Sequence, residues 1–434
     1  MSAAMTPFRD AAAAVAAAGA PIRDATADDA IDGIAPVLVA SPTSTEQVAG
    51  VLRACAEHRL AVVARGAGTK ISWGTPPDLL DLIIDVSGLD RVIEHAAGDL
   101  IVVAEAGVRL ADLNRLIGQA GQHLAVDETV TGATVGGTIC SASSGPQRLL
   151  RGTVRDLLIG LTFVRADGKV VHAGGRVVKN VAGYDLCKLL VGSYGTLGVV
   201  TQATFRLHPL PQARRVVSMV CDRPQDARDL VARIVHSQTV PSAIELDWPN
   251  DARLVVAALL EGSPVGVDER AATIAGLAGP GASISDTLPD WWGRYPWTPR
   301  TAAGETAIST DTALKLTFPV SQLHAVLDCF TALRRDGQVT LSMRGSAGTG
   351  VLYAAAHPTD ASIEASVLTA HLLARLRMTC GADGGHVVVL DAPADVKRAV
   401  DVWGPVRGLD LMRRVKREFD PEHRLSPGRF VGGI

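Results

Sequence analysis

The first half of the chain alternates short apolar runs with amphipathic stretches. An apolar run at residues 37–40 is followed by Thr43–Thr45, which can cap a helix that extends to about His58. The apolar run at 61–64 then predicts a short buried strand. This strand–helix–strand order leads directly into Arg65-Gly66-Ala67-Gly68-Thr69-Lys70, so a glycine-rich turn follows a buried strand.

Further elements of this half follow from the same periodicities. Strands are expected at 80–86, 100–104, 157–164, 170–173 and 199–207. Helices are expected at 110–120 and 184–191. Pro209 and Pro211 interrupt the pattern, and we place a domain boundary near residue 211.

Beyond residue 211 the order of elements changes. A strand, a helix, two strands and a helix are expected at 216–220, 224–236, 243–246, 254–260 and 268–278. The same order recurs at 313–318, 321–335, 339–343, 351–355 and 363–378, and a last helix at 407–419. Two such halves are expected to share one antiparallel sheet with helices on one face.

The patterns predict an α+β protein with four parts. These are a helical extension at 1–34, a first domain at 35–211, a cap domain at 212–400 with the duplicated β-α-β-β-α order, and a segment at 401–434 that returns to the first domain.

Composition narrows the class of protein. The 434 residues are 47% hydrophobic and 20% charged with a net charge of −3, which is typical of a globular protein and provides no basic field for nucleic acid or an anionic membrane. No apolar run reaches the length of a transmembrane helix, so we expect a cytoplasmic protein. The six cysteines form no CxxC pair, which argues against a structural zinc, an iron–sulfur cluster or a disulfide framework.

The turn at residues 65–70 is the first candidate for chemistry. Its glycines allow backbone N–H groups to converge on an anion such as a pyrophosphate. The spacing is not GxGxxG, so a nicotinamide site of the Rossmann type fits poorly. Taken alone, such a segment is more often a simple turn than an anion-binding site.

Three later segments share this composition of glycine and hydroxyl residues beside a strand. They are Gly132–Thr138, continued by Ser143, and the stretches 151–156 and 192–198. Small residues leave room for a flat ligand to lie against the backbone, whereas Val135 and Ile139 favour a packed segment. Glycine-rich turns often only connect one element to the next. Four of them beside strands in one half of the chain instead indicate a common ligand-binding role.

The segment Lys179-Asn180-Val181-Ala182-Gly183-Tyr184-Asp185 and the stretch 189–200 carry a resemblance to a known family. The region 37–207 resembles the FAD-binding domain of the vanillyl-alcohol oxidase / p-cresol methylhydroxylase (PCMH) superfamily. Within it, the chain looks like the glycolate oxidase and D-lactate dehydrogenase branch, and most like the small FAD-binding subunit of bacterial glycolate oxidase. Residues 419–421 and 426–429 match how these chains end.

The resemblance implies FAD as cofactor, a PCMH-type FAD-binding domain of two subdomains, and a role for individual residues. The pyrophosphate would be wrapped by Arg65, Gly66, Ala67, Gly68, Thr69 and Lys70. Thr134, Gly136, Gly137 and Ser143 would lie along the ribityl chain and flavin, Thr153 and Asp156 would fix the ring system, and Gly198 and Val200 would contact the adenosine end. Many relatives attach flavin through a His in the first turn; this turn has none, so we expect non-covalent FAD.

The second half departs from the family pattern at its metal site. Large-subunit relatives carry the motif His-x-Gly-x-Gly-x-x-His. The corresponding segment of this chain, residues 344–353, keeps the glycines and has no histidine. A later Glu-His element is also absent, and Gly384-Gly385-His386-Val387 stands in its place. Two histidines at that spacing are needed to hold the metal, so no metal site is expected. The remaining catalytic candidates are Lys315, Arg344 and Tyr353, and Arg300 is comparable. The alternative for each of them is an ordinary structural or surface role.

The resulting hypothesis is an FAD-dependent oxidoreductase subunit that acts on a small 2-hydroxy acid of the glycolate or D-lactate type. The resemblance implies a larger FAD subunit and an iron–sulfur subunit as partners, through which the protein could lie at the inner face of the membrane. The alternatives are an electron-relay or assembly subunit without its own catalytic base, and a stand-alone alcohol or sugar oxidase. The aromatic stretch 291–297 is a hydrophobic plug, a partner interface or a substrate wall.

Overall fold

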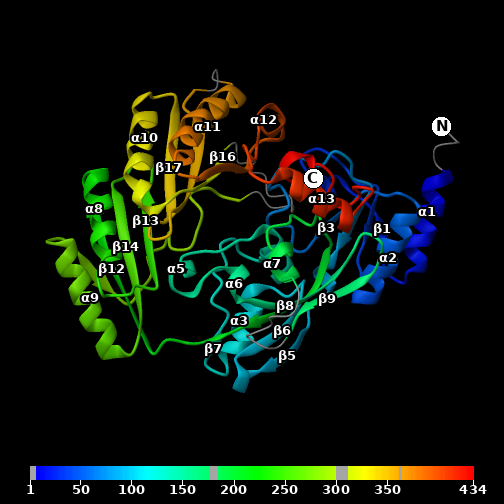
Figure 1. Cartoon of the computed structure of the whole chain (residues 1–434), viewed down its shortest axis with the longest axis horizontal. Coiled ribbons are helices and arrows are strands. Elements are labelled where there is room, and N and C mark those ends of the chain that lie inside the picture. Colours follow the sequence, from blue (N-terminus) through cyan, green and yellow to red (C-terminus); the bar gives the residue numbers. More distant parts are fainter. Residues whose placement is uncertain (1–5, 176–183, 300–310, 361–363) are drawn as a thin grey trace.

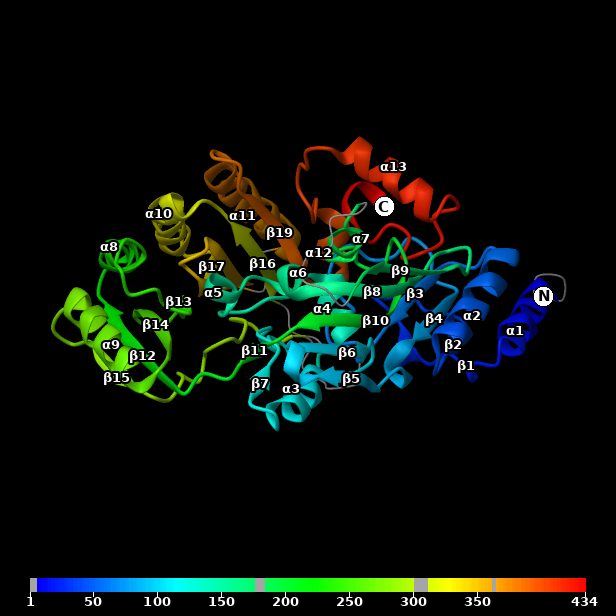
Figure 2. The same ribbon diagram turned by 60° about the horizontal axis from the view of Figure 1, so that its bottom comes forward.

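The computed structural model describes residues 6–175, 184–299, 311–360 and 364–434. Two regions lie side by side, each with its own sheets and helices (Figure 1). The first half of the chain forms one region, and the antiparallel cap sheet with its helices forms the other. The carboxy-terminal residues pack back on the first region, as Figures 1 and 2 both show.

A four-stranded sheet begins the first region, with the order β1-β2-β4-β3. Its strands are β1 (Ile22–Asp24), β2 (Leu38–Ala40), β3 (Val62–Arg65) and β4 (Leu82–Asp85), and β2, β4 and β3 run parallel. Helix α2 (Thr45–Glu57) connects β2 to β3, and its N-cap Ser44 accepts a hydrogen bond from the backbone N–H of Gln47. Helix α1 (Thr6–Ala17) packs on α2. The expected strand–helix–strand unit is confirmed.

A five-stranded antiparallel sheet completes this region, in the order β5-β6-β10-β8-β9. The strands are β5 (Val92–Ala96), β6 (Ile101–Glu105), β8 (Leu158–Val164), β9 (Val170–Gly174) and β10 (Val199–Arg206). Around it lie α3 (Leu110–Gly118), α4 (Val135–Ser141), α5 (Arg148–Arg151), α6 (Val154–Leu157), α7 (Leu186–Leu190) and the pair β7 (Gln122–His123) and β11 (His208–Pro209). One apolar core joins the two sheets.

The segment Thr134–Thr138, expected as a glycine-rich turn, is instead the start of helix α4. Thr134 is its N-cap and accepts a hydrogen bond from the backbone N–H of Gly137 at 3.3 Å. Burial of Val135 and Ile139 outweighs the low helix propensity of glycine. Gly136 also permits close packing, because a Cβ there would lie 2.9 Å from the Cβ of Ala106.

The cap region contains one eight-stranded sheet in the order β15-β12-β14-β13-β17-β18-β16-β19, antiparallel throughout. The strands are β12 (Ala213–Cys221), β13 (Ala243–Trp248), β14 (Leu254–Gly262), β15 (Ser283–Ser285), β16 (Thr312–Thr317), β17 (Val339–Ser346), β18 (Val351–Pro358) and β19 (His386–Asp391). Pairing of β13 with β17 joins the two repeats, so the expected shared sheet is confirmed. Edge strands β15 and β19 were not predicted.

Helices cover the face of the cap sheet that points away from the first region (Figure 2). They are α8 (Pro224–Val235), α9 (Pro264–Ala278), α10 (Leu323–Arg335) and α11 (Ala365–Gly381). Alternate residues of each strand, such as Leu314 and Leu316 of β16, are buried beneath these helices. The intervening residue Lys315 therefore points to the opposite face, toward the first region.

The carboxy-terminal segment carries α12 (Ala394–Ala399) and α13 (Leu409–Phe419) and then returns to β3. Leu425 pairs in parallel with Val62, and the Nζ of the fully buried Lys416 donates to Asp420 Oδ2 at 2.7 Å and to the carbonyl of Thr196 at 2.8 Å. Short 3-10 turns lie at Ala27–Asp29, Val86–Gly88, Ala97–Asp99, Val320–Gln322 and Val431–Gly433.

No helix within the described residues is both long and apolar enough to cross a bilayer.

Candidate functional site

A cavity of about 780 Å³ lies in the first region, where β3 ends and α4 begins. The contiguous run 63–71 forms one wall, so all six residues predicted from the first turn line it. Opposite this run lie members of the other glycine-rich segments: Thr134, Gly136, Gly137, Cys140, Ser141, Tyr194, Gly195, Gly198, Val199, Val200 and Arg429. The glycine-rich segments, separate in sequence, thus surround one space.

The two main glycine-rich segments touch each other directly. A Cβ on Gly66 would collide with the Oγ1 of Thr134, so only glycine allows the turn to approach the start of α4. Gly68 has φ of +73°, a conformation that disfavours other residues. Sequence therefore determines the shape of this wall through backbone geometry.

Two cations face the same cavity, the half-buried Lys70 and the buried Arg429. Burial lowers the pKa of Lys70 to about 8, and its ammonium forms no ion pair with any residue that the structure describes. Arg429 donates from Nη2 to the carbonyl of Trp73 at 2.7 Å, while its buried Nε has no hydrogen-bond partner among the described residues. An anionic ligand in the cavity would satisfy both groups. A dinucleotide with a pyrophosphate fits this wall.

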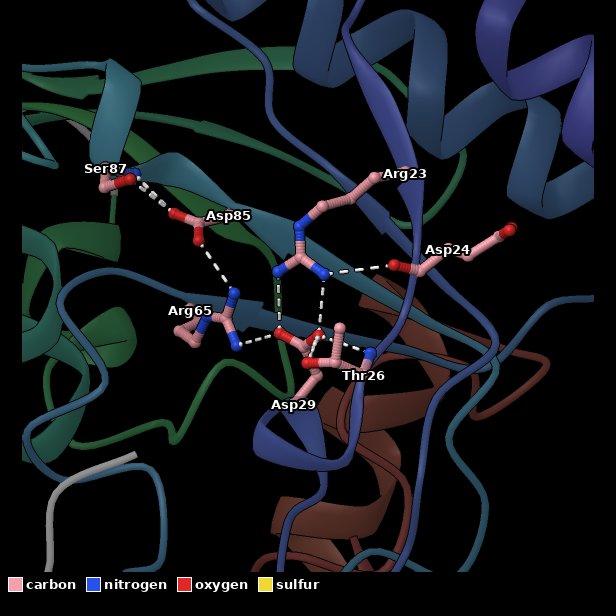
Figure 3. Close-up of polar contacts among 7 residues, drawn as sticks. All are labelled: Arg23, Asp24, Thr26, Asp29, Arg65, Asp85 and Ser87. Atoms are coloured by element: carbon pink, nitrogen blue, oxygen red, sulfur yellow. Dashed lines mark hydrogen bonds and ion pairs between the residues drawn. The ribbon is translucent and has the colours of Figure 1, made fainter. Parts of the chain in front are cut away.

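The guanidinium of Arg65 points to two carboxylates (Figure 3). Its guanidinium forms ion pairs with Asp29 at 2.8 Å and with Asp85 at 2.9 Å. Asp29 also binds Arg23 at 2.7 Å, and this hydrogen-bonded pair holds the pKa of the Asp29 carboxyl well below its usual range. Arg65 lines the cavity, but its charge is already matched by two carboxylates, so it supports the turn from beneath.

A second cavity of about 770 Å³ adjoins the first, because Ser141 and Tyr194 line both. It lies between the first region and the cap sheet. Its polar side chains come from both: Ser141 and Ser143 on one side, and Lys315, Thr317, Tyr353 and His386 on the other. Aromatic rings, among them Trp73, Tyr295 and Trp403, form the rest of the wall. Ser143, predicted to lie along the flavin, is on this second cavity.

The three catalytic candidates lie in one row across the cap sheet. Tyr353 of β18 is directly opposite Lys315 of β16 and Arg344 of β17. Lys315 and Tyr353 line the second cavity, whereas Arg344 does not. Arg344 forms an ion pair from Nε to Asp247 Oδ1 at 2.7 Å and donates to the carbonyl of Tyr295 at 3.1 Å. Direct substrate contact is therefore supported for two of the three residues.

Cations surround the phenol of Tyr353. Arg148 of α5 donates from Nη2 to the Tyr353 Oη at 3.1 Å. Burial by itself would raise the pKa of Tyr353, but the charges of Arg148 and Lys315 outweigh it and lower this pKa below its usual value. Burial also lowers the pKa of Lys315. A tyrosine whose anion is stabilised in this way can accept a proton from a bound hydroxyl group.

The aromatic stretch 291–297 contributes to both the core and the cavity. Tyr295 stacks on Trp297 with centroids 4.6 Å apart and meets the ring of Tyr353 edge-on at 4.8 Å. Trp291 and Trp292 pack instead against a small apolar cluster on the cap sheet. The stretch is thus a plug between the two regions, and Tyr295 is also part of the wall of the second cavity.

Some predicted site residues lie elsewhere. Thr153 and Asp156 are on neither cavity lining; the Asp156 carboxylate accepts 2.8 Å hydrogen bonds from the backbone N–H and the hydroxyl of Thr153, which caps helix α6. The motif residues 179–183 and Arg300 lie outside the described residues.

Several cavity residues were missed from the sequence. His386 stands where the Glu-His element was judged absent, and it lines the second cavity. Tyr194 and Arg429 belong to motifs already noticed, so their positions could have been proposed. Arg148 carried no signal, because its role depends on a contact with a residue far away in the chain.

Among the described residues, no cluster of three or more His, Cys, Asp or Glu side chains could hold a metal ion.

Two family models match the chain. One, described as an FAD binding domain, matches residues 36–174, and the other, described as the C-terminal domain of FAD linked oxidases, matches 210–288 and 402–430. The first match contains the turn at 65–70 and the start of α4. The second includes strands β12 to β15 of the cap sheet and the segment that carries Arg429.

Similar proteins agree with these matches. Glycolate oxidase subunit GlcD of Bacillus subtilis (strain 168) is 26% identical over 420 residues, which cover 91% of this chain and 89% of that protein. The mitochondrial D-lactate dehydrogenase [cytochrome] of Arabidopsis thaliana is 35% identical over 213 residues, 49% of this chain and 37% of that protein. Among solved structures, the glucooligosaccharide oxidase of Acremonium strictum has a TM-score of 0.70 at 18% identity, covering 96% of each chain, and shares the fold.

Proposed function

The chain belongs to the FAD-linked oxidoreductases, and on that premise we propose that it is an enzyme subunit that oxidises a small 2-hydroxy acid of the glycolate or D-lactate type. The observation that carries this proposal is the pair Lys315 and Tyr353. A cation and an activated phenol face each other across β16 and β18, in a cavity that joins the proposed FAD cavity.

We assign the first cavity to FAD. The backbone of residues 65–70 and the start of α4 would hold the pyrophosphate, with Lys70 and Arg429 supplying positive charge. When bound, FAD supplies an acceptor for a hydride. The turn offers Thr69 and Lys70 but no histidine, which supports non-covalent binding.

The second cavity would bind the substrate at the mouth of the FAD site. Lys315 would hold the carboxylate as a buried counter-ion. Tyr353, as a phenolate, would accept the proton of the substrate hydroxyl, and Arg148 would stabilise the phenolate. The apolar and aromatic wall would exclude water from the reacting centre.

Arg344 has a positioning role in this proposal. Its ion pair with Asp247 fixes the guanidinium, which in turn holds the carbonyl of Tyr295. The ring of Tyr295 packs against Tyr353, so Arg344 acts on the substrate cavity through the aromatic stretch.

Anaerobic mixing tests the activity. The purified flavoprotein is mixed with glycolate or D-lactate, and the visible absorbance of oxidised flavin is followed, with acetate as a control that lacks the hydroxyl group. Bleaching with the hydroxy acids is the expected result. If dithionite reduces the flavin and neither hydroxy acid does, the protein functions as an electron-relay or assembly subunit instead.

We further propose that electrons leave through partner chains, a larger FAD subunit and an iron–sulfur subunit. The similarity to a protein named as a subunit of glycolate oxidase supports this. The segment 179–185 resembles the small subunit of that enzyme more than the larger one. Affinity purification from the native cell provides the test: two stoichiometric partner chains are expected. A protein that purifies alone and reduces oxygen at full rate would be a stand-alone oxidase.

A further inference from the structure

A third, smaller space lies beside Tyr353. This rear chamber has room for about 20 Å³ of water centres, and its wall includes Thr129, Arg148, Glu245 and Ser346. Tyr295 and Tyr353 line both the rear chamber and the substrate cavity. The phenol of Tyr353 therefore borders both spaces.

The rear chamber concentrates buried oxygen atoms that lack hydrogen-bond partners among the described residues. These are Thr129 Oγ1, Glu245 Oε1 and Ser346 Oγ, none of which makes a hydrogen bond of good geometry, although the Ser346 hydroxyl is close enough to stabilise the Glu245 carboxylate and Thr129 is close to the phenol of Tyr295. Buried polar atoms are rarely left unsatisfied, and ordered water is their usual partner where a polar space is large enough. The chamber has about 20 Å³ of space for water centres, slightly more than the roughly 10 to 15 Å³ that one water needs. A bridging water would give Glu245 Oε1 a partner.

Glu245 is an unusual residue for its position. It lies within the fully buried strand β13, opposite Ser346 of β17. Burial raises the pKa of its carboxyl to about 8, and the nearby carboxylate of Asp127 acts in the same direction. The guanidinium of Arg148, the hydroxyl of Ser346 and the guanidinium of Arg344 act against this shift without cancelling it. This carboxyl can therefore gain and lose a proton near neutral pH.

The charges around Tyr353 complete the arrangement. Arg148 contacts the phenol at 3.1 Å and lies on the wall of the rear chamber, while Lys315 faces the phenol from the substrate side. Arg294 and Tyr295 also lie on the chamber wall. Among these groups, Glu245 is the carboxylate on the chamber wall, and so the one suited to take a proton from Tyr353.

We propose that Glu245 receives, through water in the rear chamber, the proton that Tyr353 takes from the substrate hydroxyl group. This step rests on the proposed function. The substrate O–H bond breaks and an O–H bond forms on the Tyr353 phenolate, while the electron pair becomes the C=O bond and the hydride on C2 leaves to the flavin as oxidant. Tyr353 then passes its proton by way of water to the Glu245 carboxylate and becomes a phenolate again. Glu245 acts through Tyr353 and does not touch the substrate.

The decisive variant is Glu245→Gln in the FAD-loaded protein. In the native protein, the rate of anaerobic flavin reduction should rise with pH through about 8, because the carboxyl must be ionised to accept a proton. In Glu245→Gln the rate should fall on the order of 10-fold and lose this rise. Glu245→Asp should keep the rise, and Glu269→Gln, at an exposed carboxylate, should match the native protein.

A second readout needs no substrate. The chain has four tyrosines, and burial raises the pKa of Tyr194 to about 13 and also raises that of Tyr295. In an ultraviolet titration of the oxidised protein, Tyr353 should therefore ionise early, and Tyr353→Phe identifies its transition. Loss of the Glu245 carboxylate should move this transition to lower pH, because a neighbouring negative charge is removed.

The outcomes separate the two proposals. An unchanged tyrosinate titration and an unchanged pH profile in Glu245→Gln would overturn the relay, even if 2-hydroxy acids reduce the flavin. A shifted titration without reduction by any 2-hydroxy acid would keep the coupling of Glu245 to Tyr353 and reject the proposed function, and the proton transfer would be rejected with it. If Glu245→Gln does not fold, the Glu245→Asp profile, expected to shift in midpoint, decides the question.

Discussion

The two adjoining cavities are built in opposite ways. One contiguous run, residues 63–71, forms a wall of the FAD cavity largely from backbone and small side chains. The substrate cavity instead takes side chains from α4, from β16, β18 and β19, and from the aromatic stretch near Tyr295. One wall of the first is thus a property of local sequence, and the second is a property of how two regions pack.

Because the two cavities are built differently, substitutions in one should have different effects from substitutions in the other. A change in the FAD cavity should alter cofactor affinity, because we propose that its residues hold the phosphates. A change in the substrate cavity should alter flavin reduction and leave FAD content intact. The following variants, in decreasing order of expected effect on function, test this separation.

Tyr353→Phe should have the largest effect. Removing the proton acceptor should slow anaerobic flavin reduction about 100-fold or more, as the loss of a general base typically does. Stopped-flow absorbance gives the rate, and the FAD-to-protein ratio should stay unchanged. Tyr184→Phe, at a side chain that is 97% exposed, is the matched control. A Tyr353→Phe rate within a few-fold of the native one would remove Tyr353 from the mechanism.

Lys315→Met should weaken substrate binding on the order of 10- to 100-fold, because the carboxylate would lose its buried counter-ion. The effect should appear in the substrate concentration that gives half-maximal reduction more than in the limiting rate. Lys169→Met changes an exposed lysine and serves as the control. An effect of Lys315→Met on FAD content, with normal saturation by substrate, would contradict the division between the cavities.

Lys70→Met should reduce FAD affinity about 10-fold and leave the chemistry of bound flavin unchanged. Its pKa of about 8 in the cofactor-free protein gives a further expectation. An anionic ligand favours the protonated amine, so native affinity should fall as pH rises through and above 8. Titration of the cofactor-free protein by flavin fluorescence measures both effects. A pH dependence that persists in Lys70→Met would assign it to another group.

Asp29→Asn should have the smallest effect on function and act on stability. The lowered pKa of Asp29 means that its carboxylate stabilises the fold above its unfolded pKa of about 4, and that this stabilisation is lost as pH falls. At neutral pH the variant should lose about 1 to 2 kcal/mol of unfolding free energy.

Denaturant titrations at several pH values measure this loss. The gap between Asp29→Asn and the native protein should narrow below pH of about 4. Asp28→Asn, at the exposed neighbouring carboxylate, should leave stability nearly unchanged. A constant gap over the whole pH range would show that the ion pairs with Arg23 and Arg65 are not its cause.

The sequence by itself determined most of the elements, the family resemblance and one wall of the FAD cavity. Alternation of apolar positions predicted most strands to within a few residues, and the repeated element order predicted the shared cap sheet. The glycines at 66 and 68 predicted the shape of a turn, because the backbone conformations open to a residue depend on that residue itself.

Only the tertiary structure decided which side chains meet. Arg65 looked like a phosphate ligand until its two carboxylate partners, Asp29 and Asp85, were in place. Arg148 had no visible role until packing brought it 3.1 Å from Tyr353, 205 residues further along the chain. Glu245 was one charged residue in an apolar strand until the rear chamber enclosed it. Charge, burial and pKa depend on neighbours from distant segments, and the order of residues along the chain does not specify those neighbours.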